Sequence, residues 1–325
     1  MECGRMSKKA NARVFGQDII KGEWHGNRAG RQAGMTNLTW VKGDRSHESL
    51  DDTSRKILAA GLHGQESTGT SIFDPVLCEL AYRWFCPPNG LILDPFAGGS
   101  VRGIVAAKLG RKYVGIDLRP EQIAANQKQA TAICDKIKPK WIVGDSLHAA
   151  KLAKAQYDFV FSCPPYGDLE VYSDNPADLS TMKWEAFCEA YRKIIAAAVG
   201  MLKPDRFACF VVGDFRDKAG FYRSFPALTA DAFEKAGAKL YNDAILVTAV
   251  GSLPIRVAKQ FTSGRKLGHT HQSVLVFCNG SPQKATAAIG DVEVGEIAEV
   301  FGGKAKLEGG HKTNGKPAKR KKQKA

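Results

Sequence analysis

The sequence contains neither a long uninterrupted apolar run nor closely spaced cysteines. No stretch reaches the roughly 18–20 consecutive apolar residues that a membrane-spanning helix needs, and the polar, basic beginning lacks the apolar centre of a signal peptide. The eight cysteines are scattered singly, with no C-x-x-C pair, whereas metal clusters and disulfide frameworks usually show paired spacings. We therefore expect a cytoplasmic protein that binds no metal.

Acidic residues are scarce relative to basic ones. The 325 residues include 47 Lys and Arg against 33 Asp and Glu, a formal net charge of +14. Such an excess attracts polyanions, and nucleic acid is the obvious one in a cytoplasm. Part of the excess lies in the tail at 312–325, and a second cluster lies at 253–271 within the expected domain. The residues expected to contact nucleic acid are Arg256, Lys259, Arg265, Lys266 and His269.

Between residues 46 and 282 the chain alternates strand-like and helix-like segments, which predicts an α/β fold with a mainly parallel sheet. The expected strands lie at residues 91–93, 113–116, 141–143, 159–161, 207–212, 244–250 and 274–277. The expected helices lie at residues 74–85, 101–109, 120–137, 184–201 and 227–236. The last two strands are expected to be joined without a helix. We therefore predict one doubly wound, seven-stranded domain, with a basic flexible arm at 1–45 and a largely disordered Gly/Lys-rich tail at 283–325.

A glycine turn follows the first expected strand, in the sequence LDPFAGGS at residues 93–100. Gly98 and Gly99 allow a ligand to approach the backbone closely. Asp117 ends the second strand, where a carboxylate can accept both hydroxyls of a ribose, and Asp145 follows the third strand. Because ligands bind at the carboxyl ends of such strands, the three loops together predict a nucleotide cofactor site.

The phosphate-binding signatures of other nucleotide cofactors are missing. The turn is not G-x-G-x-x-G, and no G-x-x-x-x-G-K-[ST] sequence occurs, so NAD and ATP would lack their phosphate cradle. S-adenosylmethionine has no phosphates and needs only a close backbone, a carboxylate for its amino group and a ribose acceptor. The residues of these loops expected to bind it are Asp94, Phe96, Gly98, Gly99, Ser100, Asp117, Asp145 and Ser146.

The fourth expected strand runs into FSCPPYG at residues 161–167. Together with the preceding DPFAGGS, GID and GDS, this segment resembles the amino-methyltransferase family of DNA methylases (N4-cytosine/N6-adenine type, phage- or bacterial-like), whose catalytic motif is [D/N/S]-P-P-[Y/F/W]. Residues 71–75 (SIFDP) resemble the family's extra cofactor motif, which implies Phe73 as a further cofactor contact. Residues 268–272 (GHTHQ) are also similar to phage-type DNA methylases. The resemblance covers residues 71–279 and implies a Rossmann-like methyltransferase sheet.

The resemblance implies transfer of a methyl group from S-adenosylmethionine to adenine N6 or cytosine N4 in double-stranded DNA. The residue before the prolines and the Pro164 carbonyl would accept the two amino hydrogens, while Tyr166 would stack on the flipped-out base. The rest of catalysis is in-line positioning, which requires no metal. The catalytic residues it implies are Ser162, Cys163, Pro164, Pro165 and Tyr166. The target-facing segments would lie at 168–182 and 253–271.

The sequence departs from the family at Cys163, a weak acceptor where Asp, Asn or Ser is usual. The choice between adenine and cytosine therefore stays open, with Ser162 as a candidate to share the acceptor role. Three alternatives also stay open: C5-cytosine methylation with Cys163 as the nucleophile, an RNA base methyltransferase, and an inactive DNA-binding homologue. The resemblance further implies DNA modification of the restriction-modification kind in a bacterial or phage-infected host cytoplasm, and the sequence names no cognate restriction enzyme.

Overall fold

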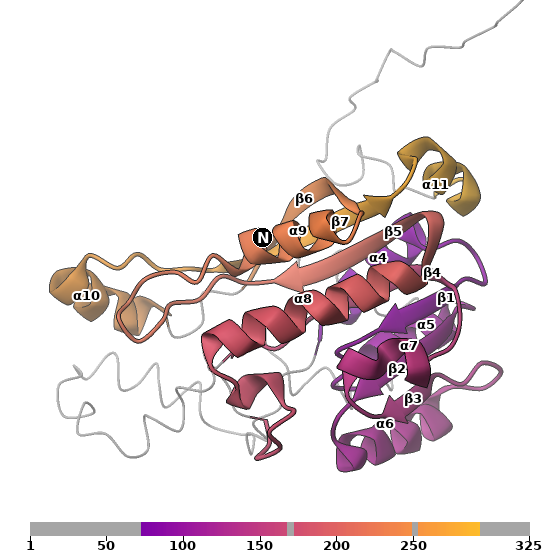
Figure 1. Cartoon of the computed structure of the whole chain (residues 1–325), viewed down its shortest axis with the longest axis horizontal. Coiled ribbons are helices and arrows are strands. Elements are labelled where there is room, and N and C mark those ends of the chain that lie inside the picture. The colour runs from indigo at the N-terminus through magenta and orange to yellow at the C-terminus, as the bar shows by residue number, and fades with distance from the viewer. Residues whose placement is uncertain (1–72, 168–171, 249–252, 293–325) are drawn as a thin grey trace, which may run out of the picture. The chain divides into compact units, whose positions relative to one another are not determined.

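The computed structural model describes residues 73–167, 172–248 and 253–292, which are built around one seven-stranded sheet (Figure 1). The strand order is β3-β2-β1-β4-β5-β7-β6. The strands are β1 Leu91–Asp94, β2 Lys112–Asp117, β3 Lys140–Val143, β4 Tyr157–Ser162, β5 Leu202–Val212, β6 Lys239–Val247 and β7 His271–Asn279. Strands β1 to β5 pair in parallel, and β7 runs antiparallel to both β5 and β6. The carboxyl ends of the five parallel strands therefore share one edge of the sheet.

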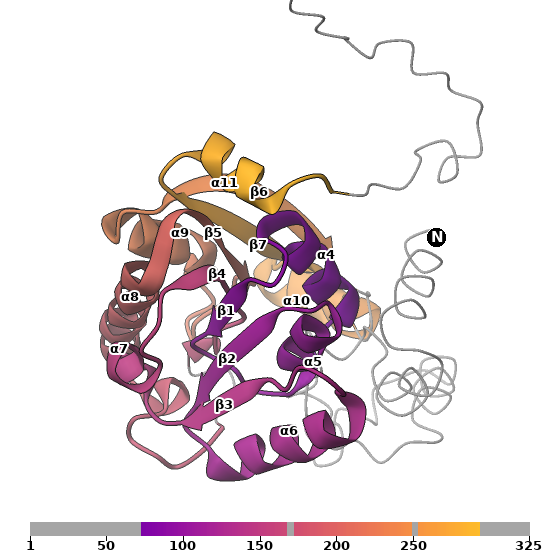
Figure 2. The same cartoon turned by 90° about the vertical axis from the view of Figure 1, so that its right-hand side faces the viewer.

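Helices cover both faces of this sheet (Figure 2). They are α4 Pro75–Phe85, α5 Val101–Lys108, α6 Pro120–Ile133, α7 Ala149–Leu152, α8 Trp184–Met201, α9 Phe225–Lys235, α10 Leu253–Gly264 and α11 Pro282–Ile289. The buried residues form two clusters, one joining the sheet to α4, α5 and α11 and the other joining it to α7, α8 and α9. The predicted doubly wound α/β fold with seven strands is confirmed.

The central strand β4 shows why the sequence folds in this way. All six of its residues are buried. Phe159 and Phe161 belong to the cluster on the α4 side, whereas Val160 belongs to the cluster on the α8 side. A strand covered on both faces requires a continuous apolar run, which is what the sequence has here.

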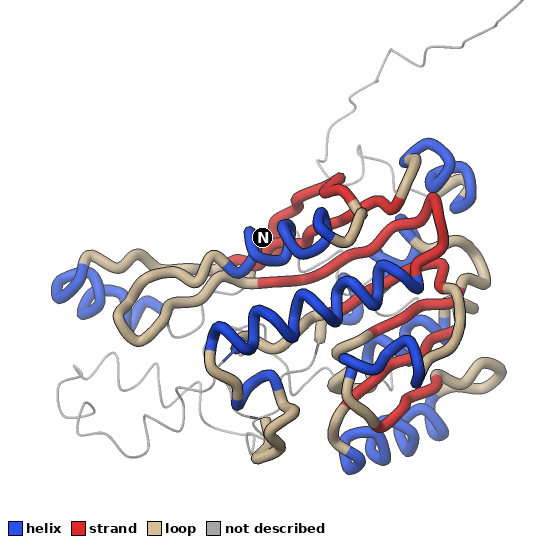
Figure 3. Tube along the Cα trace, viewed as in Figure 1, coloured by secondary structure: helices blue, strands red, loops and turns tan. Residues whose placement is uncertain are grey.

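The sequence prediction was wrong about the link between the last two strands. Helix α10 lies between β6 and β7 (Figure 3), so residues 253–264 of the expected basic loop are helical. Pro254 suits the first turn of a helix, but the basic composition of the segment concealed this signal. Strand β6 also begins earlier than expected, at Lys239. The apolar pattern did not reveal this start, because β6 is an edge strand whose residues are mostly exposed and not uniformly apolar.

Helix α11 begins where the predicted catalytic domain ended, at residue 282. Ala285 and Ile289 on this helix are buried in the cluster that also contains α4, so the packed part of the chain extends beyond the predicted boundary. The arm at 1–45 and the tail beyond 292 lie outside the described residues. Among the helices that the structure describes, none has the length and apolarity required to span a bilayer.

Replacement of Phe233 tests the packing of α9 on the sheet. Its ring stacks on Phe277 of β7 with centroids 3.9 Å apart, and both side chains are fully buried. We expect Phe233→Ala to lower the free energy of unfolding by about 3–5 kcal/mol, because it removes buried surface and leaves a cavity. Urea unfolding followed by circular dichroism measures this loss. Phe233→Leu should cost less, and equal small losses in both variants would contradict the packing described.

Candidate active site

The turn between β1 and α5 is open on the side away from the protein. Gly98 has φ +49°, in the left-handed region that favours glycine. A Cβ atom built at Gly98 or Gly99 would meet no heavy atom within 4 Å. Behind the turn the packing is tight, since a Cβ at Gly115 of β2 would lie 2.7 Å from the Cβ of Ala97. The turn therefore rests directly on β2 and leaves free space in front of its glycines.

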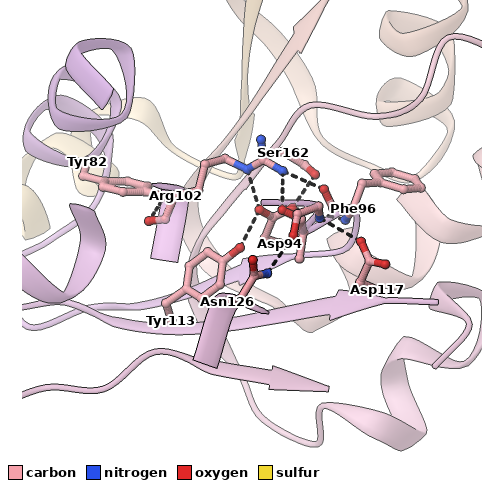
Figure 4. A network of polar contacts seen from close by, with 10 residues as sticks. Tyr82, Asp94, Phe96, Arg102, Tyr113, Asp117, Asn126 and Ser162 are labelled. Carbon is pink, nitrogen blue, oxygen red and sulfur yellow. Dashed lines mark hydrogen bonds and ion pairs between the residues drawn. The ribbon is translucent and has the colours of Figure 1, made fainter. Parts of the chain in front are cut away.

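Four carbonyl groups of this turn accept hydrogen bonds from side chains of the surrounding protein, and Figure 4 shows Arg102 and Asn126 among the donors. The bonds run from Ser146 Oγ to Pro95 O at 2.5 Å, from Arg102 Nη2 to Phe96 O at 2.6 Å and Ala97 O at 2.9 Å, and from Asn126 Nδ2 to Gly98 O at 2.7 Å. The backbone N–H of Gly98 donates to Asp117 Oδ2 at 2.9 Å. The turn is thus held in one conformation by the protein itself.

The Asp94 carboxylate is the centre of this network and is completely buried (Figure 4). One oxygen accepts from Arg102 Nε at 2.6 Å and Tyr113 OH at 2.7 Å. The other accepts from Ser162 Oγ at 2.5 Å and the Phe96 N–H at 3.1 Å. Four donors fill the usual capacity of a carboxylate. The expectation that Asp94 contacts the cofactor stays a prediction, and the structure shows that its carboxylate is bonded to the turn and to the elements around it.

Arg102 compensates the buried charge of Asp94. Burial by itself disfavours the guanidinium cation, but the adjacent carboxylate outweighs this effect, so the pKa of Arg102 lies above its ordinary value. The ring of Phe73 covers the guanidinium, with Cζ 4.8 Å from the ring centroid. Phe73 also meets Phe161 of β4 edge to face at 5.6 Å. Phe73 thus packs on Arg102, and its expected contact with the cofactor stays a prediction.

The other expected cofactor residues are also tied to the protein. Asp117 accepts one N–H on each oxygen, from Gly98 and from Arg119, both at 2.9 Å, and burial raises its pKa. Asp145 accepts the Leu147 N–H at 2.8 Å and begins a short 3-10 helix. Ser100 donates to Gln129. Of the expected carboxylates, Asp117 is the one that accepts a hydrogen bond from a glycine of the open turn, Gly98.

The C-P-P-Y segment begins where β4 ends, beside the glycine turn. Ser162 is fully buried and donates to Asp94, so its hydroxyl is committed to the internal network. The expectation that Ser162 shares the acceptor role stays a prediction. Its bond has a different consequence: the same carboxylate holds the glycine turn and the residue that precedes Cys163.

Tyr166 is half-buried and fixed on three sides. Its ring meets Phe215 at 6.0 Å and Phe225 at 5.9 Å, both edge to face. Its hydroxyl accepts a hydrogen bond from Gln272 Nε2 and lies 3.9 Å from Cys163 Sγ. Burial raises the pKa of Tyr166 well above its ordinary value, which keeps the phenol neutral. Sequence reasoning quoted Gln272 within a motif but did not assign it to the site.

The residues expected to contact nucleic acid lie on and after α10. Lys259 is exposed on the helix. Arg265 follows it with φ +51° and places its guanidinium 5.0 Å from the ring centroid of Phe261. Lys266 lies against Gly220 of the segment after β5, where a Cβ would be 2.8 Å from its Nζ. The backbone of Arg256 lies in α10. Of the other target-facing segment, residues 168–171 lie outside the described residues.

His269 stacks on His271, with ring centroids 4.0 Å apart. Burial and the neighbouring His271 lower the pKa of His269. His269 Nδ1 also lies 3.3 Å from the Tyr222 hydroxyl, and its expected contact with nucleic acid stays a prediction. Within the described part of the chain, no group of three or more His, Cys, Asp or Glu side chains is arranged to hold a metal ion.

The segment that contains the glycine turn matches a known protein family. Residues 72–128 match the family model described as DNA methylase. The resemblance stated from the sequence is thereby confirmed for this segment.

Curated relatives match over short stretches. They include the putative methylase YubD of Escherichia coli (strain K12), 39% identical over 49 residues, or 15% of this chain and 22% of that protein. The type II methyltransferase M2.LlaDCHI of Lactococcus lactis subsp. cremoris is 46% identical over 41 residues, 13% of this chain and 15% of its own. The type II methyltransferase M.HinfI of Haemophilus influenzae is 30% identical over 99 residues, 30% of this chain and 27% of its own. The chain therefore spans well under two thirds of each relative.

Similar solved structures share low sequence identity with this chain. TrmN from Thermus thermophilus has a TM-score of 0.43 and 18% identity, covering 70% of this chain and 53% of that one. A methyltransferase from Pyrococcus furiosus has a TM-score of 0.43 and 15% identity, covering 73% of this chain and 100% of that one.

Arg102→Leu tests the buried network. Removing the cation leaves the Asp94 carboxylate buried without its partner, so we expect the free energy of unfolding to fall by about 3–5 kcal/mol in urea titration. Lys108→Ala is the control on the same helix. Lys108 Nζ lies 3.3 Å from Asp135 Oδ2, and the Asp135 side chain is 86% exposed. Such exposed ion pairs contribute about 0–1 kcal/mol. Similar losses in the two variants would show that Asp94 does not depend on Arg102.

Proposed function

We propose that the protein is an S-adenosylmethionine-dependent methyltransferase that acts on an exocyclic amino group of a base flipped out of double-stranded DNA. The observation that carries the proposal is the bonding of one buried carboxylate to both halves of the site. Asp94 accepts from Arg102, which holds the glycine turn, and from Ser162, which precedes the C-P-P-Y segment. A DNA methylase signature at residues 72–128 lies in the same part of the fold.

The residues around the turn fit this cofactor. The open space in front of Gly98 and Gly99 accommodates a ligand that approaches the backbone. Asp117 uses one acceptor position on each oxygen for an N–H group, and the remaining positions suit the two ribose hydroxyls. When bound, S-adenosylmethionine supplies an electrophilic methyl group. Gly98, Gly99 and Asp117 would hold it, while Asp94 and Arg102 keep the turn in place behind it.

The C-P-P-Y segment supplies the target side. The Pro164 carbonyl accepts one hydrogen of the target amino group, which draws electron density onto the nitrogen, and Cys163 occupies the position of the second acceptor. Phe215 and Phe225 hold the Tyr166 ring in place. The ring can therefore stack on the base without losing further conformational freedom. Gln272 fixes the direction of the Tyr166 hydroxyl. The protein thus positions a weak nucleophile instead of activating it through a base.

The biological setting belongs to the same proposal. We infer a cytoplasmic DNA-modification enzyme of bacterial or phage type, acting alone or beside a restriction enzyme. Basic residues on and after α10 would face the DNA, with Lys259 and Arg265 at phosphates.

Mass spectrometry of nucleosides tests the proposal. Purified protein is incubated with unmethylated genomic DNA, or with total RNA, and methyl-labelled S-adenosylmethionine. We expect label in N6-methyladenine or N4-methylcytosine from DNA. Label in 5-methylcytosine would overturn the amino mechanism and make Cys163 the nucleophile. Label only in RNA would move the protein to the RNA enzymes, and label in neither would support an inactive binding protein.

Tyr166 variants separate the ring from the hydroxyl in the same assay. Stacking of a base on an aromatic side chain contributes about 1–3 kcal/mol, so we expect Tyr166→Ala to lower the methylation rate about 10- to 100-fold. Tyr166→Phe keeps the ring and loses the hydroxyl contacts, including those with Gln272 and Cys163, and it should retain most of the activity. Equal loss in both variants would show that the hydroxyl, not base stacking, is what matters.

Gly99→Ala tests the cofactor position. A Cβ there meets nothing in the protein, so thermal stability should not change, but the methyl group would project into the space assigned to the cofactor. We expect at least about tenfold weaker S-adenosylmethionine binding by calorimetry, the effect of roughly 1.4 kcal/mol. Gly200→Ala is the matched control, because its Cβ also meets no atom and it lies in α8. Unchanged affinity in Gly99→Ala would place the cofactor elsewhere.

A further inference from the structure

The chain between β5 and α9 folds into an ordered hairpin at residues 213–223, which we call the β5–α9 hairpin. Arg216 and Tyr222 form an isolated antiparallel bridge across it. The Asp217 N–H donates to Phe221 O at 2.8 Å, and the Phe221 N–H donates to the Asp217 carboxylate at 2.9 Å. These bonds hold the hairpin together and fix the position of its tip.

The inner side of the hairpin is attached to the catalytic segment. Phe215 is only 6% exposed and contacts the Tyr166 ring at 6.0 Å and the Trp184 ring at 5.8 Å. The hairpin is therefore fixed next to the side chain that we assign to the target base. Anything bound at Tyr166 as part of a polymer would bring its neighbouring units towards this hairpin.

The outer side of the hairpin carries exposed aromatic rings. Phe221 is 73% exposed and Tyr222 is 40% exposed. Exposed apolar surface costs free energy in water, and where it clusters it commonly marks a binding surface. Tyr222 also borders a cleft of about 300 Å³ with His269 and His271, so the aromatic surface continues from the hairpin to the residues before β7.

Basic side chains outnumber acidic ones around these rings. Lys218 is exposed beside Phe221, and Lys266 reaches Gly220 from the segment after α10. The Arg216 guanidinium lies 3.8 Å from the centroid of the Tyr222 ring. By contrast, Asp214 accepts the N–H groups of Phe215 and Phe225, and the carboxylate of Asp217 is bonded within the hairpin. Asp214 also borders the cleft, so the surface is aromatic and has a net positive charge from Arg216, Lys218 and Lys266.

We propose that the β5–α9 hairpin binds duplex DNA beside the target base, with Phe221 wedged against the adjacent base pair and Lys218 and Lys266 at phosphates. The inference rests on the proposed function. Extruding a base costs unstacking energy, and an apolar side chain inserted at the step compensates part of it. The positive charges of Lys218 and Lys266 favour a polyanion as the partner. The exposed Phe221 ring favours a polyanion whose bases can stack on it. The hairpin extends the target-facing surface beyond the segments that the sequence indicated.

Fluorescence anisotropy with the full chain tests this assignment. The probe is a labelled mixed-sequence duplex of about 30 base pairs, roughly three helical turns, titrated at several salt concentrations with S-adenosylhomocysteine present. We expect Phe221→Ala to weaken binding about tenfold, the scale of one lost stacking contact, without changing the salt dependence. Lys218→Gln and Lys266→Gln should each lower the slope of log affinity against log salt by about 1.

Matched controls lie at the opposite edge of the sheet. Trp84 near the end of α4 is 43% exposed, and Lys112 begins β2 on the surface. Trp84→Ala and Lys112→Gln should change neither the affinity nor the salt slope. Wild-type affinity in Phe221→Ala, or an equal loss in Trp84→Ala, would overturn the proposal, as would tighter binding of a single-stranded RNA of the same length with the same dependence on Phe221.

The outcome is separable from that of the proposed function. If wild-type protein methylates DNA but Phe221→Ala binds the duplex normally, the hairpin assignment is wrong and the enzyme assignment stands. If no methylation of DNA is found but Phe221→Ala loses duplex affinity, the hairpin is a DNA-binding element of a protein whose reaction is different. Because Phe221 is largely exposed, its truncation should leave the melting temperature unchanged.

Discussion

The Asp94 carboxylate accepts hydrogen bonds from four different parts of the fold: the turn at Phe96, helix α5 through Arg102, strand β2 through Tyr113, and strand β4 through Ser162. Removing a charge from water is costly unless it is paired and fully bonded. The buried carboxylate therefore needs all four donors to offset its lost hydration, and each donor uses the carboxylate as its hydrogen-bond acceptor. The arrangement of β1, β2, β4 and α5 at this edge of the sheet depends on that mutual requirement.

The consequence for the site is that its two halves cannot be positioned separately. Arg102 reaches from Asp94 to the carbonyls of the glycine turn, so the cofactor side is held from behind. Ser162 fixes the end of β4 to the same carboxylate, and the catalytic segment follows directly. The methyl transfer that we propose would depend on distance and alignment more than on acid–base chemistry. A rigid connection between the two binding surfaces is what such a reaction requires.

Packing continues from the catalytic segment towards the surface. Tyr166 is clamped by Phe215 and Phe225 and bonded to Gln272 of β7. The antiparallel strand β7, inserted between β5 and β6, is therefore part of the site and not only an edge of the sheet. Beyond Phe215 the chain emerges as a hairpin whose buried side is aromatic and whose exposed side is aromatic and positive. Part of the basic excess behind the formal charge of +14 thus lies next to the site, at Lys218 and Lys266.

The sequence by itself determined the features that depend on consecutive residues. A buried apolar strand, a glycine turn with φ +49° at Gly98 and a helix start are local properties, as is the C-P-P-Y segment after β4, so the doubly wound fold and the position of both motifs could be predicted. Only the tertiary structure decided which side chains face the site. Asp94 and Ser162 are 68 residues apart and Tyr166 and Gln272 are 106 apart, and no local pattern encodes such pairs. Asp94, Ser162 and Phe73 were predicted at the ligand because their motifs are there. The structure adds that Asp94 and Ser162 are hydrogen-bonded to each other and that Phe73 packs on Arg102 and Phe161. Whether a polar group binds a ligand or its own protein depends on those long-range contacts.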